Sequence, residues 1–385
     1  MSTSYTGVDN PEEFFQMMHW KGDSSSTTST ARSVNNATAH NSLNITSDTT
    51  MQPDWVVTKN RDTALSNSFL EYNSNLGAGT GGTETRGLFW SKGTNASDDE
   101  TYGYLSSFDS NGFSFKQGSN SNRWYFDRGE GGGDKYMSYM WKVNGGTTTS
   151  NSDGDTTADV QVNTQAGISI ATFTSPGANT NTTIGHGLGS KPDLILVKSD
   201  NAGWWMRHNG VNMTSQPSHN YLGLHSTAGG NSVGANFYAD ATKVYLKADF
   251  MGASQTTRMY CFKEIQGYSR FYRYEGAGQE NGVFVYTGFK PAFLMYKGNS
   301  SGYHWRIKDV ERDSGGNPRI QRFGPTASDG DYGGTSGNDY VDFLSNGFKF
   351  RSNNSDGNVA DIQYVYWAFA QNPFVTSSGA ATTAL

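Results

Sequence analysis

Carboxylates at alternate positions are the first residues in this chain that could do chemistry. Asp309, Glu311 and Asp313 lie at even spacing, and even spacing places side chains on one face of a strand. Glycoside hydrolysis needs two carboxylates, about 5 to 9.5 Å apart, that flank the sugar bond. The neighbouring Lys308 and Arg312 instead indicate a solvated, charged edge. A polysaccharide-cleaving enzyme is therefore the least favoured function, and we expect no catalytic residues.

Three further patterns lack the partners that their chemistry needs. Gly77–Gly82 fits a G-x-G-x-x-G sequence, but no helix that could hold a phosphate is predicted after it. Aspartates that could offer oxygen ligands to calcium lie in Asp153–Asp155 with Asp159, in Asp329–Asp331 and in Ser355–Asn358. None of these segments completes a calcium loop. The histidines considered form no H-E-x-x-H pair; they are His186, His208, His219, His225 and His304. We therefore expect no metal and no cofactor.

Two aromatic clusters are the strongest candidates for a binding site. The candidate residues are Trp204, Trp205, Arg207 and His208 in the first cluster and Tyr303, His304, Trp305 and Arg306 in the second. Trp and Tyr rings can stack on sugar rings while Arg and His supply hydrogen bonds. In an alternating strand, however, one aromatic residue of each pair must face the core. Three interpretations stay open, in order of preference: core packing, contact with another protein, and contact with a glycan.

The composition excludes several classes of protein. The 385-residue chain has a formal net charge of −6, so it has no general attraction to nucleic acid. No apolar run approaches the roughly 20 residues needed to cross a bilayer, and we expect no membrane insertion. Met1–Asn10 is polar and does not resemble a secretory signal. The single Cys261 excludes an intrachain disulfide framework and suits assembly in a reducing cytoplasm.

The elements that must position these residues occur three times. The first repeated segment runs from a proline to a lysine, at Pro53–Lys59, Pro192–Lys198 and Pro291–Lys297. Proline at the start of a strand loses no hydrogen bond that the strand needs, and the apolar run after it predicts a strand buried on both faces. We expect each lysine to mark the point where its strand emerges into solvent.

Other segments recur in the same order. Phe108–Lys116 and Phe343–Arg351 combine an Asn-Gly turn with alternating aromatic residues, and Tyr238–Leu246 keeps the alternation alone. Closing strands are predicted at Lys135–Lys142, Arg258–Lys263 and Tyr364–Phe369, and opening strands at Phe14–Trp20, Ile168–Phe173 and Phe271–Tyr274. Units of this length, with about six to eight short strands, can bury both sheet faces as a sandwich.

The chain is therefore predicted to be all-β, with three tandem, divergent antiparallel β-sandwich domains. Repeat 1 covers 1–145 and carries long loop insertions, repeat 2 covers 164–268, and repeat 3 covers 269–376. Segment 146–163 is rich in Ser, Thr, Asn and Gly and is predicted to be a flexible linker. Residues 377–385 are predicted to be a flexible tail.

The order of these segments resembles a repeated β-sandwich domain of uncharacterised virion structural proteins of marine tailed phages. The resemblance covers Asn10–Val375 and is carried by Ile184–Asp193, by the Ser-Asn-Gly-Phe turn and by Trp367–Phe374. The first copy lacks the loop at Ile184–Gly189, and the second copy lacks the turn. The resemblance implies a concanavalin-like, lectin-like or jelly-roll sandwich. It also implies a place in the phage particle, as a tail or tail fibre component or as a capsid decoration.

We therefore expect a non-enzymatic virion structural protein that acts by protein–protein assembly. The alternative is a receptor-binding adhesin that recognises a host surface glycan during host attachment. The expected partners are other virion proteins and further copies of the chain in a homo-oligomer, with the host glycan added in the alternative. The expected location is the virion, after assembly in the cytoplasm of the host bacterium.

Overall fold

The structure of the protein is a computed structural model. It describes residues 5–35, 49–62, 69–81, 86–91, 101–118, 125–129, 133–211, 220–232, 237–312, 316–321, 324, 340–353 and 356–382. Within these ranges the regular structure consists of β-strands and two single-turn 3₁₀-helices, η1 (Pro11–Glu13) and η3 (Ala248–Phe250). No helix in these ranges is long and apolar enough to cross a membrane. The predicted all-β fold class is confirmed.

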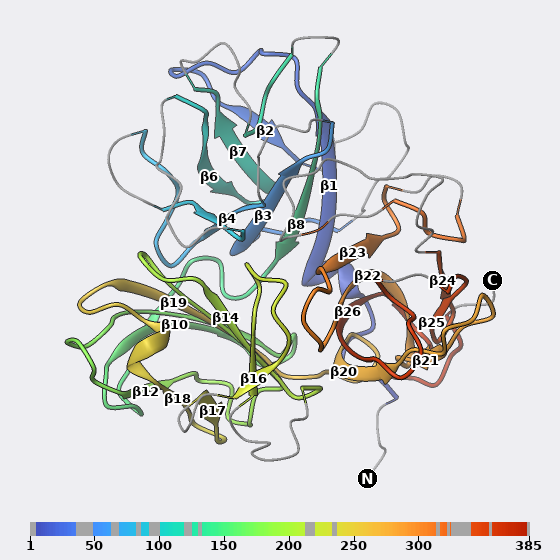
Figure 1. The fold of residues 1–385 in the computed structure, drawn as a ribbon. Helices are drawn as coiled ribbons and strands as arrows, with labels where there is room; N and C mark the ends of the chain where they lie inside the picture. Colours follow the sequence, from blue (N-terminus) through green and yellow to red (C-terminus); the bar gives the residue numbers. More distant parts are fainter. Residues whose placement is uncertain are drawn as a thin grey trace.

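The strands form three units, each with one large and one small antiparallel sheet (Figure 1). Unit 1, residues 15–141, has a large sheet in the order β1-β8-β3-β4-β5 and a small sheet in the order β2-β7-β6. Its strands are β1 (Phe15–Lys21), β2 (Arg32–Val34), β3 (Trp55–Asn60), β4 (Leu70–Asn73), β5 (Leu88–Phe89), β6 (Tyr104–Asp109), β7 (Gly112–Lys116) and β8 (Lys135–Trp141).

Unit 2, residues 149–262, has the widest sheet. Its order is β16-β15-β14-β13-β19-β11-β10-β9, and the small sheet is β12-β18-β17. The strands are β9 (Thr149–Asn151), β10 (Ala158–Asn163), β11 (Ile168–Thr174), β12 (Thr182–Gly185), β13 (Leu194–Ser199), β14 (Trp204–His208), β15 (Asn220–Gly223), β16 (Asn231–Ser232), β17 (Phe237–Ala239), β18 (Lys243–Leu246) and β19 (Thr256–Phe262).

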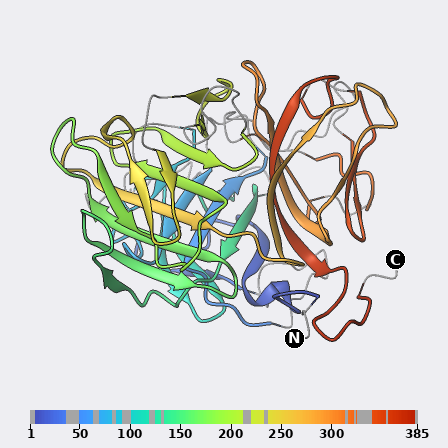
Figure 2. The same ribbon diagram turned by 90° about the horizontal axis from the view of Figure 1, so that it is seen from below.

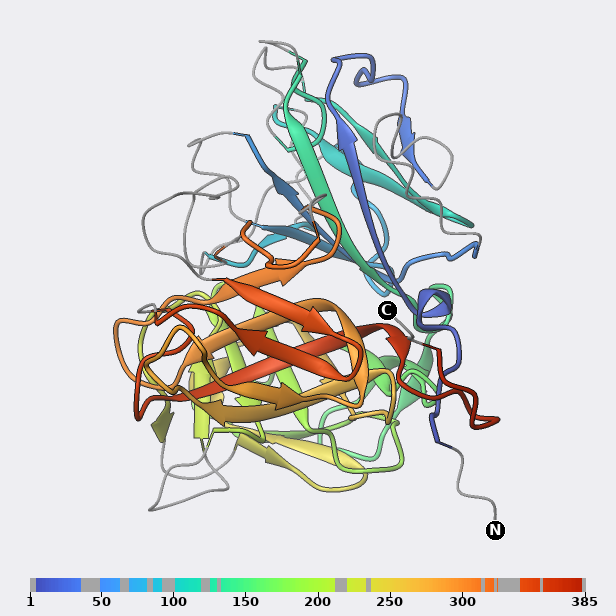
Figure 3. The same ribbon diagram turned by 90° about the vertical axis from the view of Figure 1, so that its right-hand side faces the viewer.

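Unit 3, residues 269–373, has a large sheet in the order β20-β26-β22-β23 and a small sheet in the order β21-β25-β24. Its strands are β20 (Ser269–Glu275), β21 (Phe284–Tyr286), β22 (Phe289–Gly298), β23 (Arg306–Asp309), β24 (Val341–Leu344), β25 (Gly347–Phe350) and β26 (Gln363–Pro373). The strands of this unit are orange to red in Figure 3, where unit 1 lies above units 2 and 3.

The three segments from proline to lysine occupy the same place in their sheets. Strands β3, β13 and β22 each lie between a closing strand (β8, β19 or β26) and the strand that follows in sequence (β4, β14 or β23). In units 1 and 2 the proline precedes the strand, whereas Pro291 lies inside β22 at an irregularity of the register. The thrice-repeated strand, on which the sequence interpretation depends, is therefore present.

Two of the three aromatic turn segments share a glycine for a steric reason. Ser110-Asn111 and Ser345-Asn346 are the two-residue turns that join β6 to β7 and β24 to β25. A Cβ atom at Gly112 would lie 2.0 Å from the carbonyl oxygen of Val34, and one at Gly347 would lie 2.1 Å from that of Val285. The glycine therefore lets the third strand of each small sheet approach the turn.

The prediction that the three lysines emerge into solvent is wrong. Lys59, Lys198 and Lys297 are fully buried. The ammonium of Lys198 donates to the carbonyl oxygens of Ser199 and Ala202, and that of Lys297 donates to those of Thr227 and Gly298. Burial lowers the pKa of Lys198 and of Lys297 to about 8. Lys198 and Lys297 each lie one residue before the end of their strands, where backbone carbonyls solvate the charge in place of water.

The prediction of a flexible linker over 146–163 is also wrong. Thr149–Asn151 and Ala158–Asn163 are strands β9 and β10, and β10 pairs with β11 over five residues. Ala158 and Val160 of β10 pack in the core beneath the small sheet of unit 2, whereas Thr149 and Ser150 of β9 are exposed. The predicted flexible tail forms a bridge between Val375 and Ala381, while Ser377 bonds to Asp9 near the N-terminus. Residues 383–385 lie outside the described residues.

The large sheets bury two faces each. One face of each large sheet packs against the small sheet of its own unit, and these three clusters are separate from one another. The other faces of all three large sheets meet in a single cluster, called here the shared core. It contains Trp55, Trp90, Trp141, Trp204, Trp305 and Trp367, all fully buried. Figures 1 and 2 show the three units grouped around this centre.

One polar contact of the same kind joins unit 1 to unit 2, unit 2 to unit 3, and unit 3 to unit 1. The amide of Asn73 in unit 1 donates to the hydroxyl of Tyr260 in unit 2 at 2.9 Å. His208 in unit 2 contacts the carbonyl oxygen of Tyr366 in unit 3 at 2.9 Å. Asp309 in unit 3 accepts from the hydroxyl of Tyr139 in unit 1 at 2.8 Å. Asn73, His208 and Asp309 end β4, β14 and β23, so the same strand end reaches the next unit each time. Because the units share one core, their independence as three tandem domains stays a prediction.

Candidate functional site

Two of the eight predicted binding residues belong to the shared core. Trp204 and Trp305 are fully buried there. The indole nitrogen of Trp204 donates to the carbonyl oxygen of Phe89, and that of Trp305 donates to the carbonyl oxygen of Gly223. Trp204 therefore bonds unit 2 to unit 1, and Trp305 bonds unit 3 to unit 2. The core-packing interpretation describes these two residues.

The other residues of the first cluster are Trp205, which packs in the core of unit 2, and Arg207 and His208, which lie at the end of β14. Trp205 is partly buried in the outer core of unit 2, edge-on to the rings of Tyr221 and Phe250. Arg207 is buried and donates to the side-chain oxygen of Asn209. His208 is buried at the boundary with unit 3, and burial lowers its pKa to about 4. It therefore remains a neutral structural group near neutral pH.

The second cluster is only partly accessible. Tyr303 and His304 are half-buried, and the ring of Tyr303 lies edge-on to that of Tyr364 at 5.9 Å. Arg306 is half-buried and pairs with Asp356 at 2.6 Å. The first cluster lies on β14 and the second lies at the start of β23 and just before it, in different units, so the structure does not join them into one site.

The carboxylates at alternate positions have structural partners. Asp309 is fully buried, and Arg312 pairs with it at 2.5 Å. Burial raises the pKa of Asp309, but Arg312 and the hydroxyl of Tyr139 outweigh burial and hold it below its ordinary value. Burial, with the nearby Asp309, raises the pKa of Glu311 to about 8. His19 lies 3.5 Å from Glu311. Asp309 thus stabilises the boundary between units 1 and 3. Asp313 lies outside the described residues.

The segments weighed for metal chemistry show no ligand cluster in the part of the chain that is described. No group of three or more His, Cys, Asp or Glu side chains there could hold a metal ion. The side chain of Asp155 accepts from the Thr183 hydroxyl, and His186 contacts the carbonyl oxygen of Asp240. Asp329–Asp331 and His219 lie outside the described residues.

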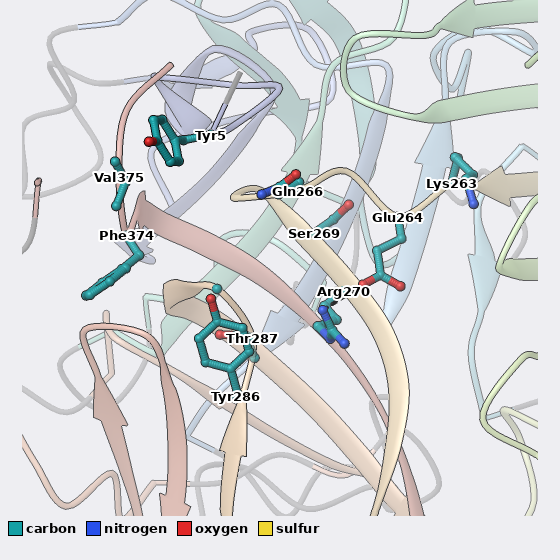
Figure 4. Close-up of a pocket in the computed structure, with 11 residues that line it drawn as sticks. Tyr5, Lys263, Glu264, Gln266, Ser269, Arg270, Tyr286, Thr287, Phe374 and Val375 are labelled. Atoms are coloured by element: carbon teal, nitrogen blue, oxygen red, sulfur yellow. Dashed lines mark ion pairs between the residues drawn. The ribbon is translucent and has the colours of Figure 1, made fainter. Parts of the chain in front are cut away.

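An open cleft lies where units 2 and 3 join and is called here the junction cleft (Figure 4). Its volume is about 460 Å³, within the 300–1,000 Å³ typical of ligand-binding clefts. The lining residues are Tyr5, Lys263, Glu264, Gln266, Ser269, Arg270, Tyr286, Thr287, Gly288, Phe374 and Val375. They come from the N-terminal segment, the β19–β20 connection, the start of β20, the end of β21, the β21–β22 connection and the segment after β26.

The junction cleft combines aromatic and charged groups. Tyr5, Tyr286 and Phe374 supply the rings, and Glu264 and Arg270 form an ion pair at 3.2 Å (Figure 4). Burial raises the pKa of Glu264, although Arg270 opposes this. Lys263 pairs with Asp193 at 2.8 Å. The site offers flat apolar faces beside fixed donors and acceptors, which suits binding better than proton transfer.

Sequence reasoning missed the junction cleft. Tyr5, Tyr286 and Phe374 lie far apart in the chain, and each stands near the end of a strand or outside one. The available signal was the alternation in β21, where Val285 is buried between exposed Phe284 and Tyr286. That pattern identifies outward-facing rings but does not show which other segments they meet.

One comparison with known proteins gives a match. Residues 10–373 match a family described as "Domain of unknown function (DUF7483)". This stretch includes all three units described above. No curated protein and no solved structure matches the chain.

Proposed function

The chain belongs to the family described as a domain of unknown function (DUF7483), and we propose that it is a structural protein of a bacteriophage particle. In this proposal it acts by protein–protein assembly, as a tail or fibre component or as a decoration of the head. Its partners are other virion proteins and copies of itself. The resemblance of its repeated segments to phage virion proteins supports the proposal.

The observation that carries the proposal is the shared core. The faces of three large sheets meet in one buried cluster that includes six tryptophans, and Asn73, His208 and Asp309 add a polar contact at each unit boundary. A large, densely packed apolar interface resists relative motion of the parts it joins. The chain is therefore suited to hold three outward-facing small sheets and their loops in fixed positions, as a particle component must.

An exposed sheet edge supports assembly as well. Strand β21 pairs with β25 only, so its other edge is open among the described residues. Phe284 and Tyr286 on this strand are 43% and 54% exposed. An open edge with exposed aromatic side chains is a surface onto which another chain can add a strand.

The test is to locate the protein in particles of the virus that encodes it. Quantitative mass spectrometry of density-purified particles should find the chain at a fixed number of copies per particle. Antibodies to the purified protein should label the same place on each particle in electron micrographs. A protein that is abundant in infected cells but absent from purified particles would contradict the proposal.

The alternative function, an adhesin that recognises a host surface glycan, is favoured by one observation. The junction cleft places three exposed aromatic rings beside an ion pair, and rings with fixed polar groups suit carbohydrate. An adhesin would also be part of the particle, so mass spectrometry alone does not separate the two. Loss of adsorption to host cells, with particle assembly intact, would favour the adhesin.

A further inference from the structure

Exposed aromatic side chains are concentrated at the junction cleft. The described part of the chain exposes six large hydrophobic side chains: Tyr5, Tyr272, Phe284, Tyr286, Ile320 and Phe374. Three of the six, Tyr5, Tyr286 and Phe374, line this one cleft and are 60%, 54% and 37% exposed. In a fold whose other aromatic residues are mostly buried, such clustering marks a surface that binds something.

Hydrogen bonds hold together the segments that carry the three rings. The amide of Gly7 and the hydroxyl of Thr6 both donate to the carbonyl oxygen of Gln266, which holds the segment that carries Tyr5 against the cleft. The amide of Phe374 donates to the carbonyl oxygen of Gly288, beside Tyr286. Segments from both ends of the chain and from the middle are thus held together. A ligand would find a formed surface, which lowers the entropy cost of binding.

The charges of the cleft are balanced. Arg270 pairs with Glu264, and Lys263 pairs with Asp193 outside the cleft. The four formal charges sum to zero, so neither a polyanion nor a polycation is attracted strongly. The exposed amide of Gln266 also lines the cleft. The available polar groups are therefore an amide, two tyrosine hydroxyls and one ion pair.

These features describe a neutral, hydroxyl-rich ligand with flat apolar faces. A pyranose ring has a face of C–H groups that stacks on an aromatic ring and a rim of hydroxyl groups that bond to amides, guanidinium and carboxylate. A phosphate-bearing ligand would need unpaired cations, and a wholly apolar ligand would leave the Arg270–Glu264 pair without solvent.

We propose that the junction cleft binds a short stretch of a neutral oligosaccharide. Tyr5, Tyr286 and Phe374 stack on the sugar faces, and Gln266, Arg270 and Glu264 bond to the hydroxyl groups. This site rests on the adhesin alternative of the proposed function, since a host surface glycan would be its ligand. The aromatic clusters at Trp204 and Trp305 take no part in it.

The test is calorimetric titration of the full chain with neutral gluco-, galacto- and manno-oligosaccharides of about six units. A polygalacturonate oligomer of the same length serves as the charged probe. At least one neutral oligosaccharide should bind, and Tyr286→Ala should weaken that binding about tenfold. Phe284→Ala is the matched control, because Phe284 is exposed on the same strand but does not line the cleft. It should leave the affinity unchanged.

Four outcomes would overturn the proposal. The first is a folded wild-type chain that binds no neutral oligosaccharide at about 10 mM. The second is Tyr286→Ala with unchanged affinity, and the third is tighter binding of the polygalacturonate. The fourth is loss of Tyr286→Ala protein from particles when the wild-type chain binds no sugar, which makes the cleft an assembly surface. Sugar binding by a protein that is absent from particles would overturn the proposed function and leave this site standing.

Discussion

The shared core and the junction cleft both contain aromatic residues, but these are buried in the core and exposed in the cleft. Trp204 and Trp305 are fully buried where three sheets meet. Tyr286 and Phe374 are exposed where two units and the chain ends adjoin. The difference teaches that aromatic density along a strand does not by itself indicate a binding surface. An aromatic side chain is available for binding only where no other unit covers the face of the sheet on which it lies.

The two regions also differ in how they are built. Equivalent strands of all three units contribute to the shared core, so it repeats around the molecule. The junction cleft combines the start of β20 and the end of β21 with connections and terminal segments. The inner faces of the repeated strands therefore carry stability here, whereas strand ends, connections and terminal segments are free to carry a binding site.

The largest expected effect is the truncation of a tryptophan in the shared core. Trp305→Ala removes a fully buried ring and its bond to Gly223, and the cavity left behind cannot collapse in a centre built from three sheets. We expect a loss of about 3–5 kcal/mol of unfolding free energy. Urea unfolding of the variant and the wild type measures it. A loss below about 1 kcal/mol would mean that the shared core does not hold the units together.

A slightly smaller loss is expected from the buried pair between units. Asp309→Asn leaves the guanidinium of Arg312 buried without its counter-charge, and it weakens the contact with Tyr139 in unit 1. We expect a loss of about 3 kcal/mol, again from urea unfolding. Asp356→Asn is the matched control, because the pair of Asp356 with Arg306 is partly exposed, at 14% and 12%, and joins residues of the same unit. If both variants lost the same amount, the contact at the unit boundary would have no special weight.

Glu71 should make the shared core sensitive to pH. It lies at the position that Met206 and Ile307 occupy in the other units, fully buried, and accepts from Trp55 and Tyr260 at 2.7 Å each. Burial raises its pKa from 4.5 to about 7.

The sign of the pH effect follows from this shift. A carboxyl whose pKa is higher in the folded state contributes its full stability below pH 4.5, where it is protonated in both states. That contribution falls as the pH rises to about 7, by about 3 kcal/mol at most. Unfolding curves between pH 4.5 and 8 should show a smaller fall in Glu71→Gln than in the wild type, by about 3 kcal/mol at most, because Glu311, whose pKa is also raised, contributes to both proteins. The same slope in both proteins would assign it to other groups.

The sequence predicted the repeated strands but not what covers them. Proline, apolar run and lysine identified β3, β13 and β22 correctly, because burial on both faces leaves a continuous apolar pattern. The same pattern does not reveal what covers each face of the strand. One face packs against the small sheet of its own unit, and the other packs against the other two units. For that reason Lys198 was predicted to be exposed, and Trp204 and Trp305 were offered as binding residues. The cleft was missed because Tyr5, Tyr286 and Phe374 meet only after folding.

The smallest expected effect on stability is at the junction cleft. The ring of Tyr286 is 54% exposed, so Tyr286→Ala removes little buried area. It should change the unfolding free energy by no more than about 0.5 kcal/mol. Paired with Trp305→Ala in one urea experiment, it compares an exposed ring with a buried one in the same unit. A loss above about 1 kcal/mol for Tyr286→Ala would show that its ring supports the fold, and the contrast between core and cleft would then fail.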